Sequence, residues 1–172
     1  MVNDMDVRVK LALDAIRAYV TRGEVIAVPA DLPAELTDSN AATFVSLKKD
    51  GELRGCIGTI EPARPSVAEE IISNAISAAV RDPRFLPVEP EELDDLVCSV
   101  DVLTPPEECD IGDLDPGRYG VIVDSGSRRG LLLPDLEGID SIEEQVGIAR
   151  RKGGIGPYEH VKLYRFEVVR YK

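Results

Sequence analysis

The sequence predicts an α+β fold with a mostly antiparallel sheet and flanking helices. Runs of β-forming residues are joined by short turns, which is typical of antiparallel strands. Two capping boxes begin helical segments, and these helices are inserted between groups of strands rather than after every strand. No internal repeat and no long linker divides the 172 residues, so we expect one domain over residues 1–172.

The chain opens with a predicted helix from about Asp6 to Arg22. Apolar residues recur there at helical spacing, at Val9, Ala12, Leu13, Ile16, Tyr19 and Val20. Gly23 is placed as the C-terminal stop of this helix. A connector punctuated by Pro29 and Pro33 follows it.

A β-hairpin is predicted around Asp50-Gly51, because Asp-Gly between two β-forming runs favours a type I′ turn. The second arm is the hexapeptide from Leu53 to Gly58. Strand alternation gives this arm two faces, one with Arg54, Cys56 and Gly58 and the other with Leu53, Gly55 and Ile57. Glycines weaken a strand, so these two indicate that another backbone or a ligand approaches closely.

The next predicted helix begins at a capping box, Ser66 with Glu69, and ends at about Arg81 before Asp82-Pro83. Its alanines predict close packing against the sheet. A strand over Leu96–Leu103 follows, with an apolar face made of Leu96, Cys98, Val100 and Val102.

The remaining predicted elements are a hairpin, a helix and a last strand. They are the hairpin of Tyr119–Val123 with Gly130–Leu133, the helix from the capping box Ser141/Glu144 to Gly153-Gly154, and the strand Val161–Tyr171.

The hexapeptide Leu53–Gly58, LRGCIG in one-letter code, resembles the signature of the AMMECR domain family. Phe44–Leu47, Asp82–Phe85 and Val161–Phe166 also resemble family segments in the family's order, so the resemblance runs from about Asp6 to Tyr171. The resemblance implies a domain with a larger and a smaller lobe and with the signature near the cleft between them. It implies no particular reaction. Relatives in the family are associated with a Memo-type protein and a radical-SAM protein. This association implies that these two proteins are partners of the present protein in a shared pathway.

Composition restricts the partners and the compartment. The net charge of −12 opposes nucleic-acid binding, for which the basic clusters at Arg128-Arg129 and Arg150–Lys152 are small. The three cysteines, Cys56, Cys98 and Cys109, are widely spaced and odd in number, as in proteins of a reducing compartment. No apolar run is long enough to cross a membrane, and the N-terminus has no signal-peptide pattern, so we expect a soluble cytoplasmic protein.

Cys56 is the candidate nucleophile or redox thiol, because Arg54 on the same face would stabilise its thiolate. The alternative is a small buried hydrophobe, since cysteine is among the most buried residue types. His160, the single histidine, would form a dyad with Cys56 only if the fold brings the two together. We expect no metal site and no cofactor, because no set of ligands at metal spacing and no phosphate-binding loop is present.

Arg84 directly follows Asp82-Pro83 and has two interpretations. Its guanidinium would either clamp an anionic ligand through two hydrogen bonds or pair with a nearby carboxylate, and we favour the ion pair. The candidate ligand- or partner-binding residues are therefore Arg54, Gly55, Cys56, Gly58 and Arg84.

Three function classes remain. The first is a ligand- or partner-binding module that acts with Memo-type and radical-SAM proteins through a cleft at the LRGCIG strand. The alternative is a small cysteine-dependent enzyme that uses Cys56 with Arg54, and the third is an RNA-linked regulator. We rank them in this order, because the chain lacks an assembled acid–base or metal set and is acidic.

Overall fold

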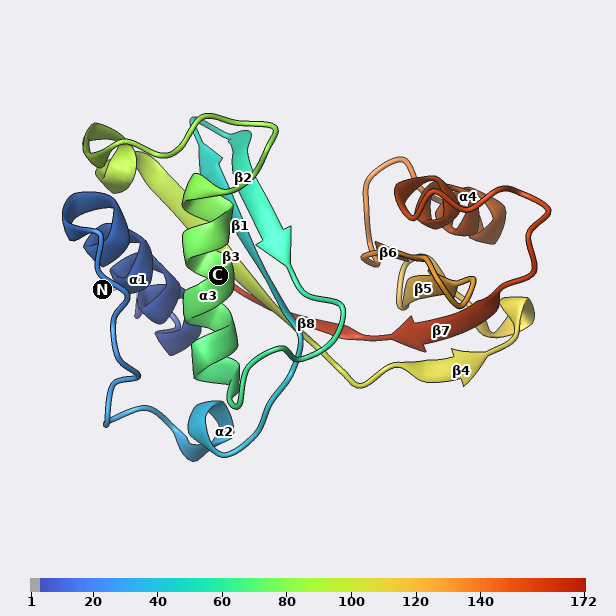
Figure 1. Ribbon diagram of the computed structural model, residues 1–172, viewed down its shortest axis with the longest axis horizontal. Helices are drawn as coiled ribbons and strands as arrows, with labels where there is room; N and C mark the ends of the chain where they lie inside the picture. Colours follow the sequence, from blue (N-terminus) through green and yellow to red (C-terminus); the bar gives the residue numbers. More distant parts are fainter. Residues whose placement is uncertain (1–3) are drawn as a thin grey trace. The chain divides into compact units, whose positions relative to one another are not determined.

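The computed structural model describes residues 4–172, which form two compact units with one sheet each (Figure 1). The chain leaves unit 1 after Val102, builds unit 2 from Leu103 to Val168, and returns to unit 1 with Val169–Lys172. The predicted α+β class is confirmed, but the antiparallel strands form two sheets. No helix within residues 4–172 is both long and apolar enough to cross a membrane.

Unit 1 is a four-stranded sheet, in the order β2-β1-β3-β8, with two main helices. Its elements are α1 (Val7–Arg22), α2 (Ala34–Thr37), β1 (Thr43–Lys49), β2 (Glu52–Gly58), α3 (Val67–Val80), the 3₁₀ helix η1 (Pro90–Asp95), β3 (Leu96–Leu103) and β8 (Val168–Tyr171).

Unit 2 has a four-stranded sheet in the order β4-β7-β5-β6, with one helix. Its elements are β4 (Glu107–Cys109), the 3₁₀ helix η2 (Ile111–Asp113), β5 (Gly120–Asp124), β6 (Arg129–Leu132), α4 (Ile142–Lys152) and β7 (Lys162–Phe166).

The predicted helices are present, with Ser66 and Ser141 as N-caps and Gly23 as a C-terminal stop, although the return hydrogen bond of a capping box is not formed at either serine. The side chain of Asp6 accepts a hydrogen bond at the start of α1, and Gly23 ends that helix with a φ of 68°. Ser66 and Ser141 accept hydrogen bonds from the backbone N–H groups of Glu69 and Glu144. Each capping group satisfies a backbone donor that the first helical turn leaves without a partner.

The predicted strand Val161–Tyr171 is wrong as one element, because the chain changes sheets at Glu167. The break is fixed by Thr104, whose backbone N–H donates to the Glu167 carbonyl at 2.9 Å and whose Oγ1 accepts from the Glu167 N–H at 2.8 Å. A run of β-forming residues does not reveal this change of partner. The result is two strands, β7 in unit 2 and β8 in the sheet of unit 1.

The core of unit 1 lies between the sheet and the pair α1 and α3 (Figure 1). Its fully buried side chains include Ile16 of α1, Ile71 of α3, Val45 and Leu47 of β1, and Val100 of β3. Strand alternation then places the intervening residues of β1, β2 and β3 on the other side of the sheet. We call that side the outer face, made of Phe44, Ser46, Lys48, Leu53, Cys56, Gly58, Val97, Ser99 and Asp101.

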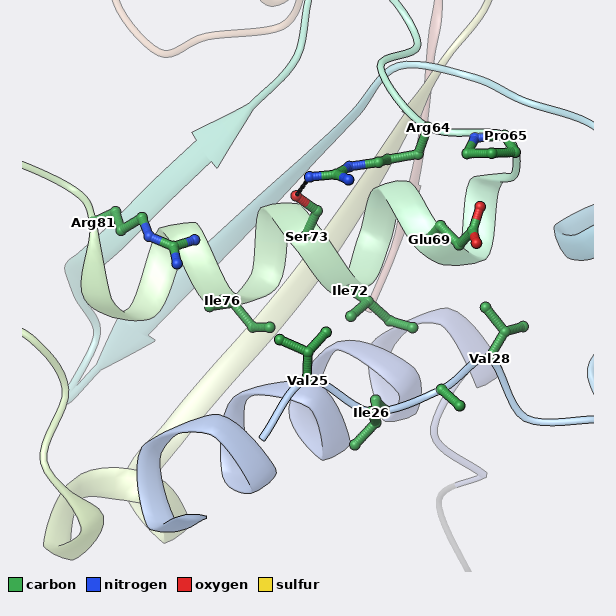
Figure 2. A pocket seen from close by; sticks show the side chains of 11 residues that line it. Val25, Ile26, Val28, Arg64, Pro65, Glu69, Ile72, Ser73, Ile76 and Arg81 are labelled. Atoms are coloured by element: carbon green, nitrogen blue, oxygen red, sulfur yellow. Dashed lines mark hydrogen bonds between the residues drawn. The ribbon is translucent and has the colours of Figure 1, made fainter. Parts of the chain in front are cut away.

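A groove of about 430 Å³ lies on α3 at the side of the connector that follows α1 (Figure 2). Residues 25–28 of the connector form one wall, and Ile72 and Ile76 of α3 belong to the apolar lining.

Candidate functional site

The LRGCIG strand, β2, contains a bulge that changes which residues share a face. Asp50 and Gly51 form the predicted tight turn, with φ values of 53° and 79°. Lys48 then pairs with Leu53, and Leu47 pairs with Gly55, so Arg54 is an extra residue without a cross-strand partner. The prediction that Leu53 shares a face with Gly55 and Ile57 is therefore wrong, because the extra residue shifts the alternation by one.

Both glycines of the signature are in close contact with this chain's own atoms. A Cβ on Gly55 would lie 2.1 Å from the carbonyl oxygen of Ala78, so α3 packs directly against the strand backbone. A Cβ on Gly58 would lie 2.2 Å from the ring of Phe44, its cross-strand neighbour. Another backbone does approach Gly55, and an aromatic ring covers Gly58.

Arg54 is held by an ion pair with Glu92 of η1. Its Nε and Nη2 donate to the two carboxylate oxygens at 3.0 Å each, and its Nη1 donates to the Leu86 carbonyl at 2.9 Å. The side chains of Arg54 and Glu92 are only 15% and 17% exposed. The guanidinium lowers the pKa of Glu92 to about 2, helped by the backbone N–H of Glu89 and by Lys49. Arg54 therefore fastens η1 to the signature strand.

Asp82 and Arg84 close the free edge of β2 at Cys56. β2 is the first strand in its sheet, so its outward N–H and C=O groups have no strand partner. The Cys56 N–H donates to the carboxylate of Asp82 at 3.0 Å, and Arg84 Nη2 donates to the Cys56 carbonyl at 3.4 Å. Arg84 also binds Asp82 through Nε and Nη2, at 3.0 and 2.7 Å, which lowers the pKa of the buried Asp82 carboxyl far below its usual range.

Cys56 is half-buried on the outer face, where it lies across from Ser46 of β1. Burial raises the pKa of its thiol, and a hydrogen bond with Ser46 and the charge of Arg84 offset this only in part. The cation that acts on the thiol is Arg84, whereas Arg54 is held by Glu92. The other two thiols also have raised pKa values through burial, Cys98 to about 12.

The outer face carries a row of exposed side chains beside Cys56. Leu53, Lys48 and Val97 lie side by side across three strands, with Leu53 40% and Val97 67% exposed. Next to them is a cavity of about 510 Å³, whose lining includes Ser46, Lys48, Val97, Ser99 and Met5. Sequence reasoning missed Val97 as a site residue. The sequence did contain a signal for it, because Val97 is an apolar residue on the face of the strand opposite the apolar one.

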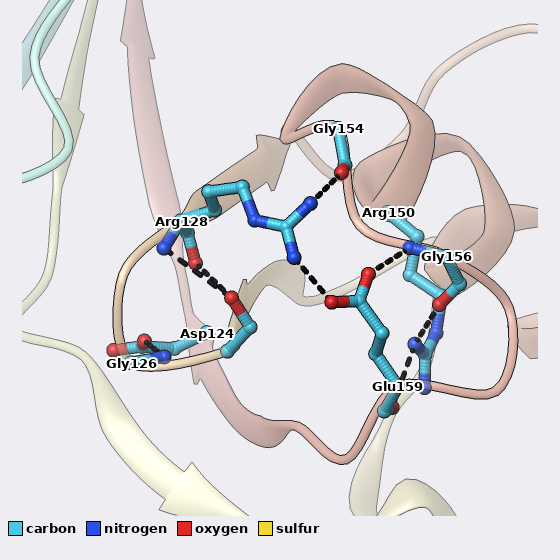
Figure 3. A network of polar contacts seen from close by, with 8 residues as sticks. Asp124, Gly126, Arg128, Arg150, Gly154, Gly156 and Glu159 are labelled. Carbon is cyan, nitrogen blue, oxygen red and sulfur yellow. Dashed lines mark hydrogen bonds and ion pairs between the residues drawn. The ribbon is translucent and has the colours of Figure 1, made fainter.

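In the two basic clusters, Arg128-Arg129 and Arg150–Lys152, arginine side chains form hydrogen bonds within unit 2 (Figure 3). Arg128 donates to the carboxylate of Glu159 and to the Gly154 carbonyl, and Arg150 donates to the carbonyls of Gly156 and Glu159 at 2.7 and 3.1 Å. These contacts tie the loop after α4 to the β5–β6 turn. Guanidinium groups engaged in this way offer little free positive charge to phosphates.

The structure brings Arg54, Gly55, Cys56, Gly58 and Arg84 together at β2, but His160 belongs to unit 2, so the Cys56–His160 dyad and the cleft between two lobes stay predictions. Within residues 4–172, no group of three or more His, Cys, Asp or Glu side chains is placed to hold a metal ion.

The AMMECR1 family profile matches residues 9–171. The chain belongs to this family. The resemblance drawn from LRGCIG is therefore confirmed. A protein of Thermotoga maritima is 55% identical over 167 residues, which are 95% of this chain and 96% of that protein. The crystal structure of the uncharacterized protein PH0010 from Pyrococcus horikoshii has a TM-score of 0.87 and 39% identity, and the match covers 95% of this chain and 88% of that one.

A second relative in the AMMECR1 family has a different extent. A protein of Clostridium acetobutylicum is 48% identical over 170 residues, which are 98% of this chain but only 36% of the Clostridium protein. In that relative, the AMMECR1 region is therefore one part of a longer chain.

Proposed function

We propose that this AMMECR1-family protein is a binding module whose outer face docks a Memo-type protein that acts with a radical-SAM protein. The observation that carries the proposal is the row of Leu53, Lys48 and Val97 on the face that also presents Cys56. Two exposed apolar side chains on one face, next to a concave surface, offer a partner protein apolar area to bury.

The contacts of the signature support a binding role, because they hold the surface rigid. Gly55 lets α3 pack against the strand, Arg54 fastens η1 to it, and Asp82 with Arg84 closes its edge at Cys56. A surface that is ordered before its partner arrives loses less conformational entropy on binding. The signature residues thus act mainly by shaping β2, and the binding side chains are their neighbours on the outer face.

The Clostridium acetobutylicum relative supports a partner protein. Its AMMECR1 region is joined to further sequence that makes up most of the chain. Joining two modules in one chain raises the effective concentration of each for the other, which suits proteins that work together.

The cysteine-dependent enzyme is the alternative, and the local chemistry of Cys56 disfavours it. A nucleophilic cysteine needs a thiolate, which a nearby cation or base stabilises. Burial raises the pKa of Cys56, and Arg84, the cation that offsets this, is itself engaged with Asp82. The thiol therefore serves better as a half-buried contact than as an attacking group.

Binding of the purified Memo-type protein from the same genome, measured by biolayer interferometry, tests the proposal. Val97→Asp should weaken binding by about tenfold or more, because it places a desolvated charge in the interface. Ile111→Asp is the matched control, since Ile111 is an exposed β-branched residue, 53% accessible, that lies outside the outer face in η2. If both variants keep wild-type melting temperatures and bind as the wild type does, the outer face is not the docking surface.

A further inference from the structure

We propose a second binding site, for a small organic anion with an apolar body, in the groove between α3 and residues 25–28. The groove has a volume of about 430 Å³, which is within the usual range for small-molecule sites. Its apolar lining consists of Ile72 and Ile76 of α3 with Val25, Ile26 and Val28 of the connector (Figure 2). None of these residues belongs to the signature strand or to the outer face.

Two arginines at the rim supply the positive charge. Arg64 Nη2 lies 3.5 Å from Ser73 Oγ, and Arg81 contacts Ser77 Oγ at 3.4 Å and the Tyr19 hydroxyl at 3.5 Å. Within residues 4–172, neither guanidinium contacts a carboxylate, although the chain has 32 acidic residues and most of its other arginines form ion pairs. These two groups are therefore available for an external anion.

The two guanidiniums lie beside serines on successive turns of α3. Ser73 and Ser77 are one helical turn apart on α3, about 6 Å along the helix axis. A carboxylate or a phosphate presents several acceptor oxygens, and the planar guanidinium fork binds such groups through paired hydrogen bonds. To bind one anion, Arg64 would exchange its long contact with Ser73, and Arg81 its long contacts with Ser77 and Tyr19, for the anion's oxygens.

The connector contributes backbone groups as well. Residues 25–28 have no regular secondary structure and make no backbone–backbone hydrogen bond within the described part of the chain. Their N–H and C=O groups therefore remain available to a ligand, as in many small-molecule sites.

Glu69 sets the orientation of the ligand. Its side chain lines the groove near Pro65, at the opposite end from Arg81 (Figure 2). A negative head group is repelled there and attracted to Arg64 and Arg81. The apolar body then lies along Ile72 and Val25.

Titration of the ¹⁵N-labelled protein with hexyl phosphate or hexanoate tests this site and separates the two head groups. Two matched probes each lack one half of the ligand. Inorganic phosphate lacks the apolar body, and 1-hexanol lacks the anionic head group. We expect saturable amide shifts at Ala27, Ser73 and Ser77 with at least one hexyl anion, and much weaker ones with either half alone. This test is independent of binding by the outer face.

Variants assign the contacts. Arg64→Gln and Arg81→Gln should each weaken binding by about tenfold, because each removes a charge-assisted contact. Val25→Ser should weaken it less, and Glu69→Gln should strengthen it. Arg17→Gln is the charge-matched control, because Arg17 pairs with Asp94 away from the groove.

Three results would overturn the site. They are the absence of saturable shifts with both hexyl anions, equal binding of inorganic phosphate alone, and a loss in Arg17→Gln as large as in the rim variants.

Discussion

Cys56 is the residue to which the sequence most directly assigns chemistry, and its surroundings predict a slow thiol. Burial raises its pKa, so only a small fraction is thiolate at neutral pH. Alkylation of the folded protein, followed by peptide mass spectrometry, should modify Cys109 before Cys56, and Cys98 only on unfolding. Arg54→Gln should leave the rate at Cys56 unchanged. If Cys56 instead reacts first, with an apparent pKa below about 8.5, the enzyme alternative regains support.

The two signature glycines should respond differently to an added methyl group. Gly55→Ala forces a Cβ against the backbone of α3 and should destabilise the protein by about 3 kcal/mol. Gly58→Ala meets the near end of the Phe44 ring, a side chain rather than a backbone, and should cost less, about 1 kcal/mol. Urea unfolding measures both. A Gly55→Ala variant as stable as the wild type would show that α3 does not press on the strand.

The ion pair between β2 and η1 gives an expected pH dependence. Arg54, with the Glu89 backbone N–H and Lys49, lowers the folded-state pKa of Glu92 from 4.5 to about 2. The stabilisation from ionised Glu92 is therefore complete above pH 4.5 and is lost as the pH falls toward 2. Arg54→Leu should therefore cost roughly 2 kcal/mol at pH 7 and progressively less below pH 4.5. Melting temperatures from pH 7 to pH 3 check this, with Arg17→Leu as control. A difference that stays constant with pH would contradict it.

Elements with local signals were predictable from the sequence, and those that depend on distant partners were not. The capping serines Ser66 and Ser141 and the Asp50-Gly51 turn act through neighbouring residues, so the helices and the first hairpin were confirmed. The bulge at Arg54 depends on the pairing with β1, and the break at Glu167 depends on Thr104. Neither pairing is visible in a local pattern.

The same distinction applies to the candidate site. The sequence grouped Arg54, Cys56 and Arg84 as candidate binding residues without placing Arg84 beside the strand, where it contacts the Cys56 carbonyl. It did not predict the ion pair of Arg54 with Glu92 or the pairing of Val97 with Lys48. In each case the two residues are far apart in the chain.

The charge of the whole molecule predicts weak interaction with nucleic acids. The net charge is −12, and Arg128 and Arg150 of the basic clusters are bound internally. We expect RNA and duplex DNA to bind no more tightly than about 10⁻⁴ M at physiological salt, as measured by fluorescence anisotropy. Nanomolar affinity with a steep salt dependence would favour the RNA-linked regulator instead.

Hydrogen–deuterium exchange of the protein with and without the proposed Memo-type partner tests the central claim most directly. If the outer face is the docking surface, amides of residues 44–48, 53–58 and 96–99 should gain protection, and those of residues 25–28 should not change. Val97→Asp should abolish the added protection. A stable complex that protects other segments and leaves these three unchanged would contradict the account.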